Sequence, residues 1–211
     1  MCVIIVCPPK VRPGLDALMS CASSNPHGAG VAWRASGAVR WTKNLGPVEV
    51  NKLVRKLKGE VVIHFRFASV GGVSPQLCHP FPVSRAAQTD LVGKAPRVLF
   101  HNGTWIGFKD ALAYIEKQEK RKVGGEISDS RVMALLVNHL HNPDLLQSVE
   151  GKFVLMSGTK TSLFGQWREW NGMQCSNLGF LYEMERSCHR YWKKKPSDQL
   201  ALCWADTEEA P

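Results

Sequence analysis

Short apolar runs bounded by turn residues occur along the whole chain and predict a fold rich in strands. Residues 3–6, Val-Ile-Ile-Val, predict a buried strand that ends before Pro8-Pro9. Ser36-Gly37 separates residues 31–34 from residues 39–42 and predicts a hairpin of two antiparallel strands. Further strands are expected at residues 60–67, 98–100, 153–156, 162–167 and 173–175, with Asn171-Gly172 as a tight turn.

Apolar residues at helical spacing predict helices among these strands. We expect them at residues 12–22, 47–58 and 107–121, and another that begins at Ser128-Asp129, where either side chain can cap the first backbone N–H groups. In the first helix, Leu15, Leu18 and Met19 are expected on the apolar side. Strands come first and last and alternate irregularly with helices. This order favours an α+β sandwich over a doubly wound parallel sheet.

Length and composition indicate the number of domains, the net charge and the expected cellular compartment. The 211 residues suit one domain with a substantial core, and 27 Lys+Arg against 18 Asp+Glu give a net charge of +9. Such a charge attracts nucleic acid or small anions, although it also fits an ordinary basic surface. Seven cysteines form no Cys-x-x-Cys pair, so a zinc site is not expected. The sequence has no signal peptide or membrane-spanning run, and we expect a cytoplasmic protein with reduced thiols.

Cys2 directly follows the initiator methionine, and its small side chain permits removal of Met1. The processed chain would carry a thiol and a free α-amine on the same residue. Because an α-amine has a pKa of about 7.7–8.0, it can accept the proton of a thiol whose ordinary pKa is about 8.5. This arrangement predicts a nucleophile with its own base. The alternative is that the chain begins Met-Cys for no chemical reason.

Polar clusters lie where predicted strands end or where a helix begins, and they indicate which substrate this nucleophile would attack. Asn102, with a neighbouring backbone N–H, can stabilise the oxygen that becomes negative when a thiol attacks an amide. Arg66 can bind a carboxylate through two parallel hydrogen bonds, and Asp129 can pair with an ammonium group. Glutamine has both charges and a side-chain amide. Each cluster taken alone also fits an ordinary ion pair, turn or helix cap.

Six motifs occur in the order found in class II glutamine amidotransferases, which the chain resembles over roughly residues 2–180. They are Met1-Cys2, residues 25–30 (Asn-Pro-His-Gly-Ala-Gly), residues 64–71 (His-Phe-Arg-Phe-Ala-Ser-Val-Gly), His79-Pro80-Phe81, His101-Asn102-Gly103 and Ser128-Asp129-Ser130. These enzymes are N-terminal-nucleophile (Ntn) hydrolases. The resemblance implies a four-layer αββα sandwich of two antiparallel sheets between helical layers, in a domain of residues 2–185 followed by a tail of residues 186–211.

The resemblance also implies a role for individual residues. Cys2 would be the nucleophile, and Asn102 with Gly103 would form the oxyanion hole. Arg66 and Asp129 would bind the carboxylate and amino groups of glutamine, with Ser69 beside them and the histidines His64, His79 and His101 as supporting residues. The expected reaction releases ammonia through a γ-glutamyl thioester, with no cofactor and no metal. As in small stand-alone members of the family, a separate enzyme would accept the ammonia.

The sequence departs from the common family pattern at three positions. Val3 stands where many members have glycine, His27 where aspartate is frequent, and Ser69 where threonine is usual. Two alternatives therefore stay open. The first is a hydrolase of another γ-glutamyl amide. The second is a non-catalytic Ntn-fold module that binds nucleic acid, with Trp192-Lys193-Lys194-Lys195 able to stack on a base and contact phosphate.

Overall fold

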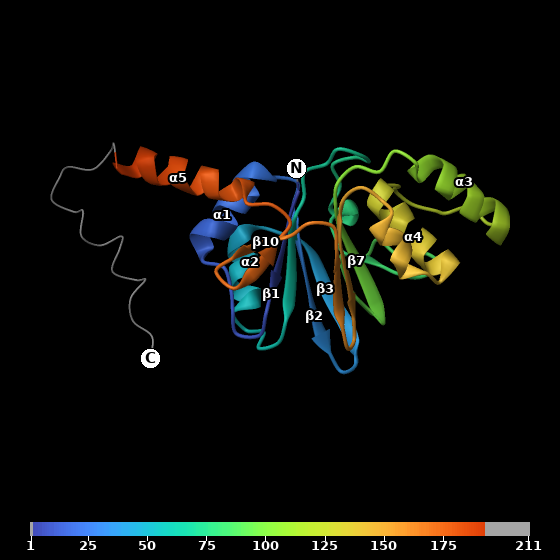
Figure 1. Ribbon diagram of the computed structural model, residues 1–211, viewed down its shortest axis with the longest axis horizontal. Helices are drawn as coiled ribbons and strands as arrows, with labels where there is room; N and C mark the ends of the chain where they lie inside the picture. Colours follow the sequence, from blue (N-terminus) through green and yellow to red (C-terminus); the bar gives the residue numbers. More distant parts are fainter. Residues whose placement is uncertain (1, 193–211) are drawn as a thin grey trace.

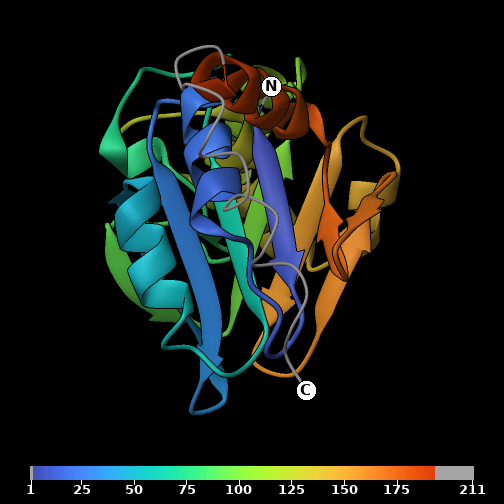
Figure 2. The same cartoon turned by 90° about the vertical axis from the view of Figure 1, so that its left-hand side faces the viewer.

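The computed structural model describes residues 2–192, with side chains up to residue 186, and in this range two antiparallel sheets lie between two helical layers (Figures 1 and 2). The larger sheet has the order β10-β11-β1-β4-β2-β3-β6, which are Arg168–Trp170, Met173–Cys175, Val3–Cys7, Val61–Phe65, Ala29–Ala35, Ala38–Leu45 and Val92–Ala95. The smaller sheet has the order β5-β7-β8-β9, which are Phe81–Pro82, Arg97–Asn102, Lys152–Ser157 and Thr161–Phe164.

Helices cover the outer face of each sheet, as Figure 1 shows. On the larger sheet lie α1 (Leu15–Ser24), α2 (Pro47–Val54) and α5 (Gly179–Trp192). On the smaller sheet lie α3 (Phe108–Glu119) and α4 (Asp129–Leu140). Short 3₁₀ helices occur at Pro75–Leu77 and Pro143–Gln147.

The central strand β1 explains why this sequence forms four layers. Val3, Ile5 and Cys7 pack with the helices on the larger sheet, whereas Ile4 and Val6 point the other way, toward the smaller sheet. A strand buried on both faces needs apolar residues at every position, which is the pattern of residues 3–7. β1 lies between β11 and β4, in the interior of the larger sheet. Cys2 directly precedes β1, so it is held where this strand begins.

A strand is present at each expected place, and the antiparallel pairing of β2 with β3 around Ser36-Gly37 is confirmed. The strands expected at residues 60–67 and 162–167 end earlier, at Phe65 and Phe164, and β5, β6 and β10 were not predicted.

The prediction for α1 is wrong in part. Leu15 and Met19 are 39% and 50% exposed, and the buried face is formed by Ala17, Leu18, Ser20 and Cys21. The helix begins three residues later than predicted, after Gly14, and this shifts the face that meets the sheet.

The C-terminal helix α5 was not predicted from the sequence. It continues the chain from β11 and packs Phe180 against Trp170, with the ring centroids 5.1 Å apart. The predicted boundary at residue 185 falls inside this helix, and residues 193–211 lie outside the described part, so the domain division stays a prediction. None of the helices in residues 2–192 is long and apolar enough to cross a membrane.

Candidate active site

The thiol of Cys2 lies at the start of β1 and contacts the chain that follows β4. The Phe67 N–H donates to Sγ at 3.2 Å, and the Phe67 carbonyl oxygen lies 3.3 Å from the same sulfur. Cys2 is partly exposed. The side chain of Asn177 holds the backbone of Cys2 from the other side, because its Nδ2 donates to the Cys2 carbonyl at 2.7 Å. The sulfur therefore has a fixed position with one side open.

That open side faces a cavity of about 790 Å³. Four of the predicted site residues line it together: Cys2, Ser69, Asn102 and Gly103. The remaining wall is formed by Phe67, Thr104, residues 149–152 and residues 165–166. Asn102 ends β7 and Gly103 follows it, so a side-chain amide and the backbone after it face the same space as the thiol. This is the arrangement that attack on an amide carbonyl requires.

The environment of Cys2 raises the pKa of its thiol above the ordinary value, because burial disfavours the charged thiolate. The N–H of Phe67 and the charge of Arg66 act in the opposite direction and offset part of this effect. The thiol is therefore protonated at neutral pH and needs a base to become a nucleophile.

Arg66 is 3% exposed and does not line the cavity. Its guanidinium donates to the carbonyl oxygen of Gly72 at 2.9 Å and to that of Val70 at 3.3 Å. Among residues 2–186, no carboxylate forms an ion pair with it. A buried guanidinium with only carbonyl partners retains donors and an unbalanced charge, both of which favour an anionic ligand.

Asp129, the first residue of α4, is 4% exposed and also lies behind the cavity wall. Ser128 caps the helix by accepting from the Arg131 N–H, so the carboxylate of Asp129 can accept from the Trp105 N–H at 2.9 Å. Its nearest cationic candidate is His101, at 3.9 Å. Burial lowers the pKa of His101 to about 4, so this ring is neutral at pH 7. The carboxylate is therefore a buried anion without a charged partner in the described chain.

The three histidines predicted to support the site form a buried row behind it. The rings of His64 and His79 have centroids 4.0 Å apart, and His64 Nε2 lies 3.3 Å from the His101 carbonyl oxygen. The ring of His101 stacks on Phe153 at 4.4 Å and bonds to the hydroxyl of Ser130 at 3.0 Å. They brace the ends of β4 and β7, and no group of three potential metal ligands is present in the described residues.

Sequence reasoning missed Ser176, which joins the two halves of the site. Its Oγ accepts hydrogen bonds from the Ile4 N–H and from Asn102 Nδ2, each at 2.8 Å. This contact fixes the orientation of the Asn102 amide and leaves the second N–H of Nδ2 for another acceptor. Ser176-Asn177 directly follows β11. The rule that selected the other clusters, polar residues where a strand ends, would also have selected this pair.

His27, one of the departures from the family pattern, holds the segment that contacts Cys2. Its Nδ1 accepts from the Ala68 N–H at 2.9 Å, and its ring stacks on Phe67 at 5.3 Å. Backbone hydrogen bonds between His27 and Arg66 and between Arg66 and Gly28 add to this connection. Ser69 is held separately, by a hydrogen bond of 3.0 Å to Thr104.

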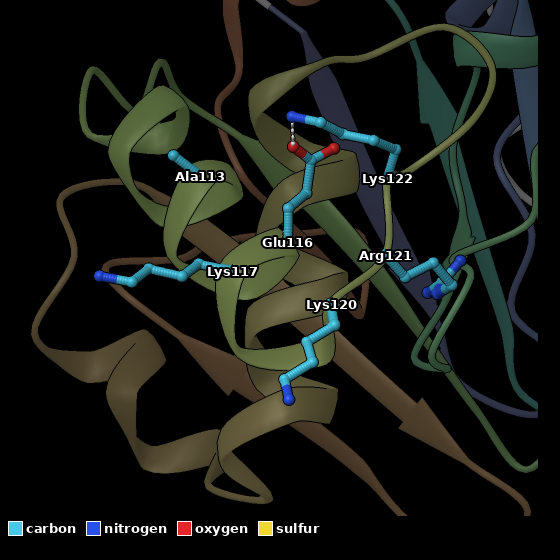
Figure 3. Close-up of a pocket in the computed structure, with 6 residues that line it drawn as sticks. All are labelled: Ala113, Glu116, Lys117, Lys120, Arg121 and Lys122. Carbon is cyan, nitrogen blue, oxygen red and sulfur yellow. Dashed lines mark hydrogen bonds and ion pairs between the residues drawn. The ribbon is translucent and has the colours of Figure 1, made fainter.

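A different hollow, shown in Figure 3, is lined by Ala113, Glu116 and Lys117 of α3 and by the basic residues Lys120, Arg121 and Lys122 that follow the helix. This hollow of about 400 Å³ shares no residue with the Cys2 cavity and lies on the outer helical layer. Glu116 accepts from Lys122 Nζ at 2.7 Å and neutralises part of the charge there. Lys193-Lys194-Lys195, on which the nucleic-acid alternative depends, lies outside the described residues.

No protein-family model and no curated protein matches this chain. Several solved structures resemble it, and two of them illustrate the likeness. One is glutamine phosphoribosylpyrophosphate (PRPP) amidotransferase from B. subtilis in complex with ADP and GMP, with a TM-score of 0.57 and 15% identity over 88% of this chain and 44% of that chain. The other is described as the allosteric regulatory enzyme of purine biosynthesis, with a TM-score of 0.57 and 19% identity over 83% of this chain and 41% of that chain.

The chain therefore spans less than half the length of either solved protein, and at this identity the likeness concerns the fold. The two antiparallel sheets between helical layers confirm the predicted α+β architecture. The chain shares this fold, two antiparallel sheets between two helical layers, with the two solved structures.

Proposed function

We propose that this protein hydrolyses the side-chain amide of glutamine, with Cys2 as the nucleophile after removal of Met1. The observation that carries the proposal is the meeting of the Cys2 thiol with Asn102 and Gly103 at one cavity. Cys2 directly precedes β1 of the larger sheet, whereas Asn102 and Gly103 lie at the end of β7 of the smaller sheet, far from Cys2 in sequence. If Asn102-Gly103 were only a turn and Cys2 only a surface thiol, we would not expect them to line the same cavity.

The buried charges behind the cavity support glutamine as the substrate. Arg66 is a buried cation and Asp129 a buried anion, and the described residues pair neither with a permanent opposite charge. Burial of unpaired charges is costly, so a ligand that brings one charge of each sign would stabilise both. The α-carboxylate and α-ammonium of an amino acid are such a pair. Both side chains would have to turn from their present backbone partners toward the cavity.

The reaction follows from these positions. The α-amine of Cys2 takes the thiol proton, and the thiolate forms a C–S bond to the amide carbon. Asn102 Nδ2 and the Gly103 N–H stabilise the oxyanion. The C–N bond then breaks as the ammonium group of Cys2 returns the proton to the departing ammonia. Water adds to the thioester with the same amine as base, and cleavage of the C–S bond gives glutamate and the free thiol.

Ammonia and glutamate release from L-glutamine tests this proposal. The protein is expressed without an N-terminal tag, so that Met1 can be removed. We expect equal amounts of the two products from the wild type, none from Cys2→Ala, and near-normal activity from Cys21→Ala, a control that removes a buried thiol of α1. Product formation by Cys2→Ala at the wild-type rate would refute the assignment.

The proposal covers the release of ammonia only. More than half of each solved neighbour has no counterpart in this chain. A separate enzyme that accepts the ammonia, and a cytoplasmic location, both stay predictions.

A further inference from the structure

A second cavity adjoins the one that contains the Cys2 thiol. It has a volume of about 280 Å³ and is lined by Lys152, Gln166, Arg168, Ser176, Asn177 and Leu178. Lys152 and Gln166 line both cavities. Asn177, in the second cavity, also bonds to the Cys2 carbonyl. We call this second cavity the extension, because it shares Lys152 and Gln166 with the candidate active site.

The extension lies on the side that a leaving group would occupy. Ser69 and Thr104 line the main cavity but not the second one. Asp129 accepts a hydrogen bond from the N–H of the residue that follows Thr104. Arg66 donates hydrogen bonds to backbone carbonyls in the loop that contains Ser69. The glutamyl part of a substrate bound by Arg66 and Asp129 would therefore lie at the end of the main cavity that Ser69 and Thr104 line. The amine on the far side of the scissile bond then faces Lys152 and Gln166.

The space is larger than glutamine needs. Cavities of roughly 300–1,000 Å³ hold drug-sized ligands. The main cavity, at about 790 Å³, is already in the upper part of this range before the extension is added. When the leaving group is ammonia, the extension stays empty of substrate.

The extension is also cationic. Lys152 at the start of β8 and Arg168 at the start of β10 both line it, and no acidic side chain does. Neither cation forms an ion pair with any residue whose side chain the structure describes. The 14-residue helix α5 begins next to Leu178 and adds the positive end of its dipole. Two cations in a concave site next to the nucleophile fit a carboxylate.

We propose that the preferred substrate is a γ-glutamyl amide whose leaving amine carries a carboxylate, which binds Lys152 and Arg168. This inference rests on the proposed amide hydrolysis and defines its substrate class. Attack by Cys2 breaks the same C–N bond, and the amine departs with the proton held by the α-amine of Cys2. The product is a free amino acid instead of ammonia.

A matched pair of substrates tests the inference. γ-Glutamylglycine carries the carboxylate, and γ-glutamylglycinamide has almost the same size without the charge. We expect the wild type to show kcat/KM at least tenfold higher for γ-glutamylglycine. Arg168→Gln is expected to bring the ratio of the two kcat/KM values close to one. Because a ratio is independent of the folded fraction, partial unfolding of the variant does not affect it.

Lys160→Gln provides the control, since Lys160 is an exposed lysine in the turn between β8 and β9 and lines neither cavity. It should leave the ratio at the wild-type value. Equal kcat/KM values for the two amides in the wild type, or an unchanged ratio in Arg168→Gln, would overturn the inference while glutamine hydrolysis stands. If neither these amides nor glutamine is hydrolysed, the proposed function fails and the inference fails with it.

Discussion

At the scale of single residues, the site depends on hydrogen bonds that hold chemical groups in a fixed orientation. Ser176 is 1% exposed, and its hydroxyl accepts from the strand that carries Cys2 and from the amide of Asn102. Its position is fixed in turn, because its N–H donates to the Ile4 carbonyl at 2.9 Å. Ser176 is therefore a positioning residue. It acts on the reaction through Asn102 and does not need to touch the substrate.

Ser176→Ala should lower kcat for glutamine about tenfold to hundredfold, which is less than the 10²–10³-fold loss typical when an oxyanion donor is removed outright. KM should change little, because the predicted groups that bind the α-carboxylate and the α-amine are untouched. Ser176→Thr keeps the hydroxyl and should recover most of the activity. Steady-state kinetics of ammonia release measure both variants.

Alkylation by iodoacetamide separates this role from a loss of folding. The reagent reacts with a thiol without forming an oxyanion, so Cys2 in Ser176→Ala should be labelled at the wild-type rate. A parallel fall in labelling and turnover would indicate a general structural defect and contradict the positioning role.

Three of the eleven other residues that line the cavity with Cys2 could be predicted, because they belong to polar clusters at or after the ends of strands. Ser69, Asn102 and Gly103 belong to motifs whose order along the chain resembles that of a known family. The sequence could not predict that Arg66 and Asp129 point to backbone groups behind the cavity wall. That orientation depends on the Val70 and Gly72 carbonyls and on the Trp105 N–H, and backbone groups leave no mark in the sequence.

At the scale of elements, close packing between β2 and the segment before β5 holds the histidine row in place. Gly30 in β2 pairs with His64 in β4. A Cβ atom at position 30 would lie 1.7 Å from the carbonyl oxygen of His79. Because Gly30 and His79 meet through backbone atoms of buried segments, neither segment can move aside without a change in the sheet.

Gly30→Ala should destabilise the protein by about 3 kcal/mol or more, at the upper end of the cost of overpacking a core. Gly59→Ala is a suitable control, because no atom lies within 4 Å of a Cβ placed there. Urea unfolding followed by tryptophan fluorescence compares the two variants with the wild type. Equal stability of Gly30→Ala and wild type would show that the strand can move away from His79.

Secondary structure was predicted well where the apolar pattern has one interpretation. In β1, burial on both faces makes every position apolar, and the strand was predicted almost to its ends. In α1, Leu15 and Met19 have the right spacing for a core face but are exposed, because the start of the helix determines which residues meet the sheet. In α5, polar residues are frequent, but Phe180, Leu181 and Met184 pack against the core at helical spacing. The pattern of this segment therefore contained a helical signal that the prediction did not use.

At the scale of the whole molecule, the two sheets enclose a row of neutral histidines. His64 is fully buried, and burial lowers its pKa to about 3. Burial also places the pKa of His79 well below its ordinary value and that of His101 at about 4. In the unfolded chain these rings titrate near pH 6.5. Below that pH the unfolded state binds protons that the native state excludes, so stability is full above pH 6.5 and falls as the pH drops toward 3.

Removal of one of these rings should reduce the acid sensitivity of the fold. Between pH 6 and pH 4, one proton bound only by the unfolded state lowers the free energy of unfolding by about 1.4 kcal/mol per pH unit. His64→Gln should reduce the slope of unfolding free energy against pH by about this amount. The exposed His141 gives the control His141→Asn, which should keep the wild-type slope. An unchanged slope in His64→Gln would mean that His64 is protonated in the native state.

The central claim is that Cys2 is the nucleophile at the N-terminus of the mature protein. Intact-mass analysis of the untagged protein after incubation with a glutamine-analogue diazo-ketone tests it most directly. We predict a chain that lacks Met1 and carries one adduct, located on Cys2 by peptide mapping and absent from Cys2→Ala. A folded protein that retains Met1, remains unlabelled, or carries the adduct on another cysteine would contradict the account.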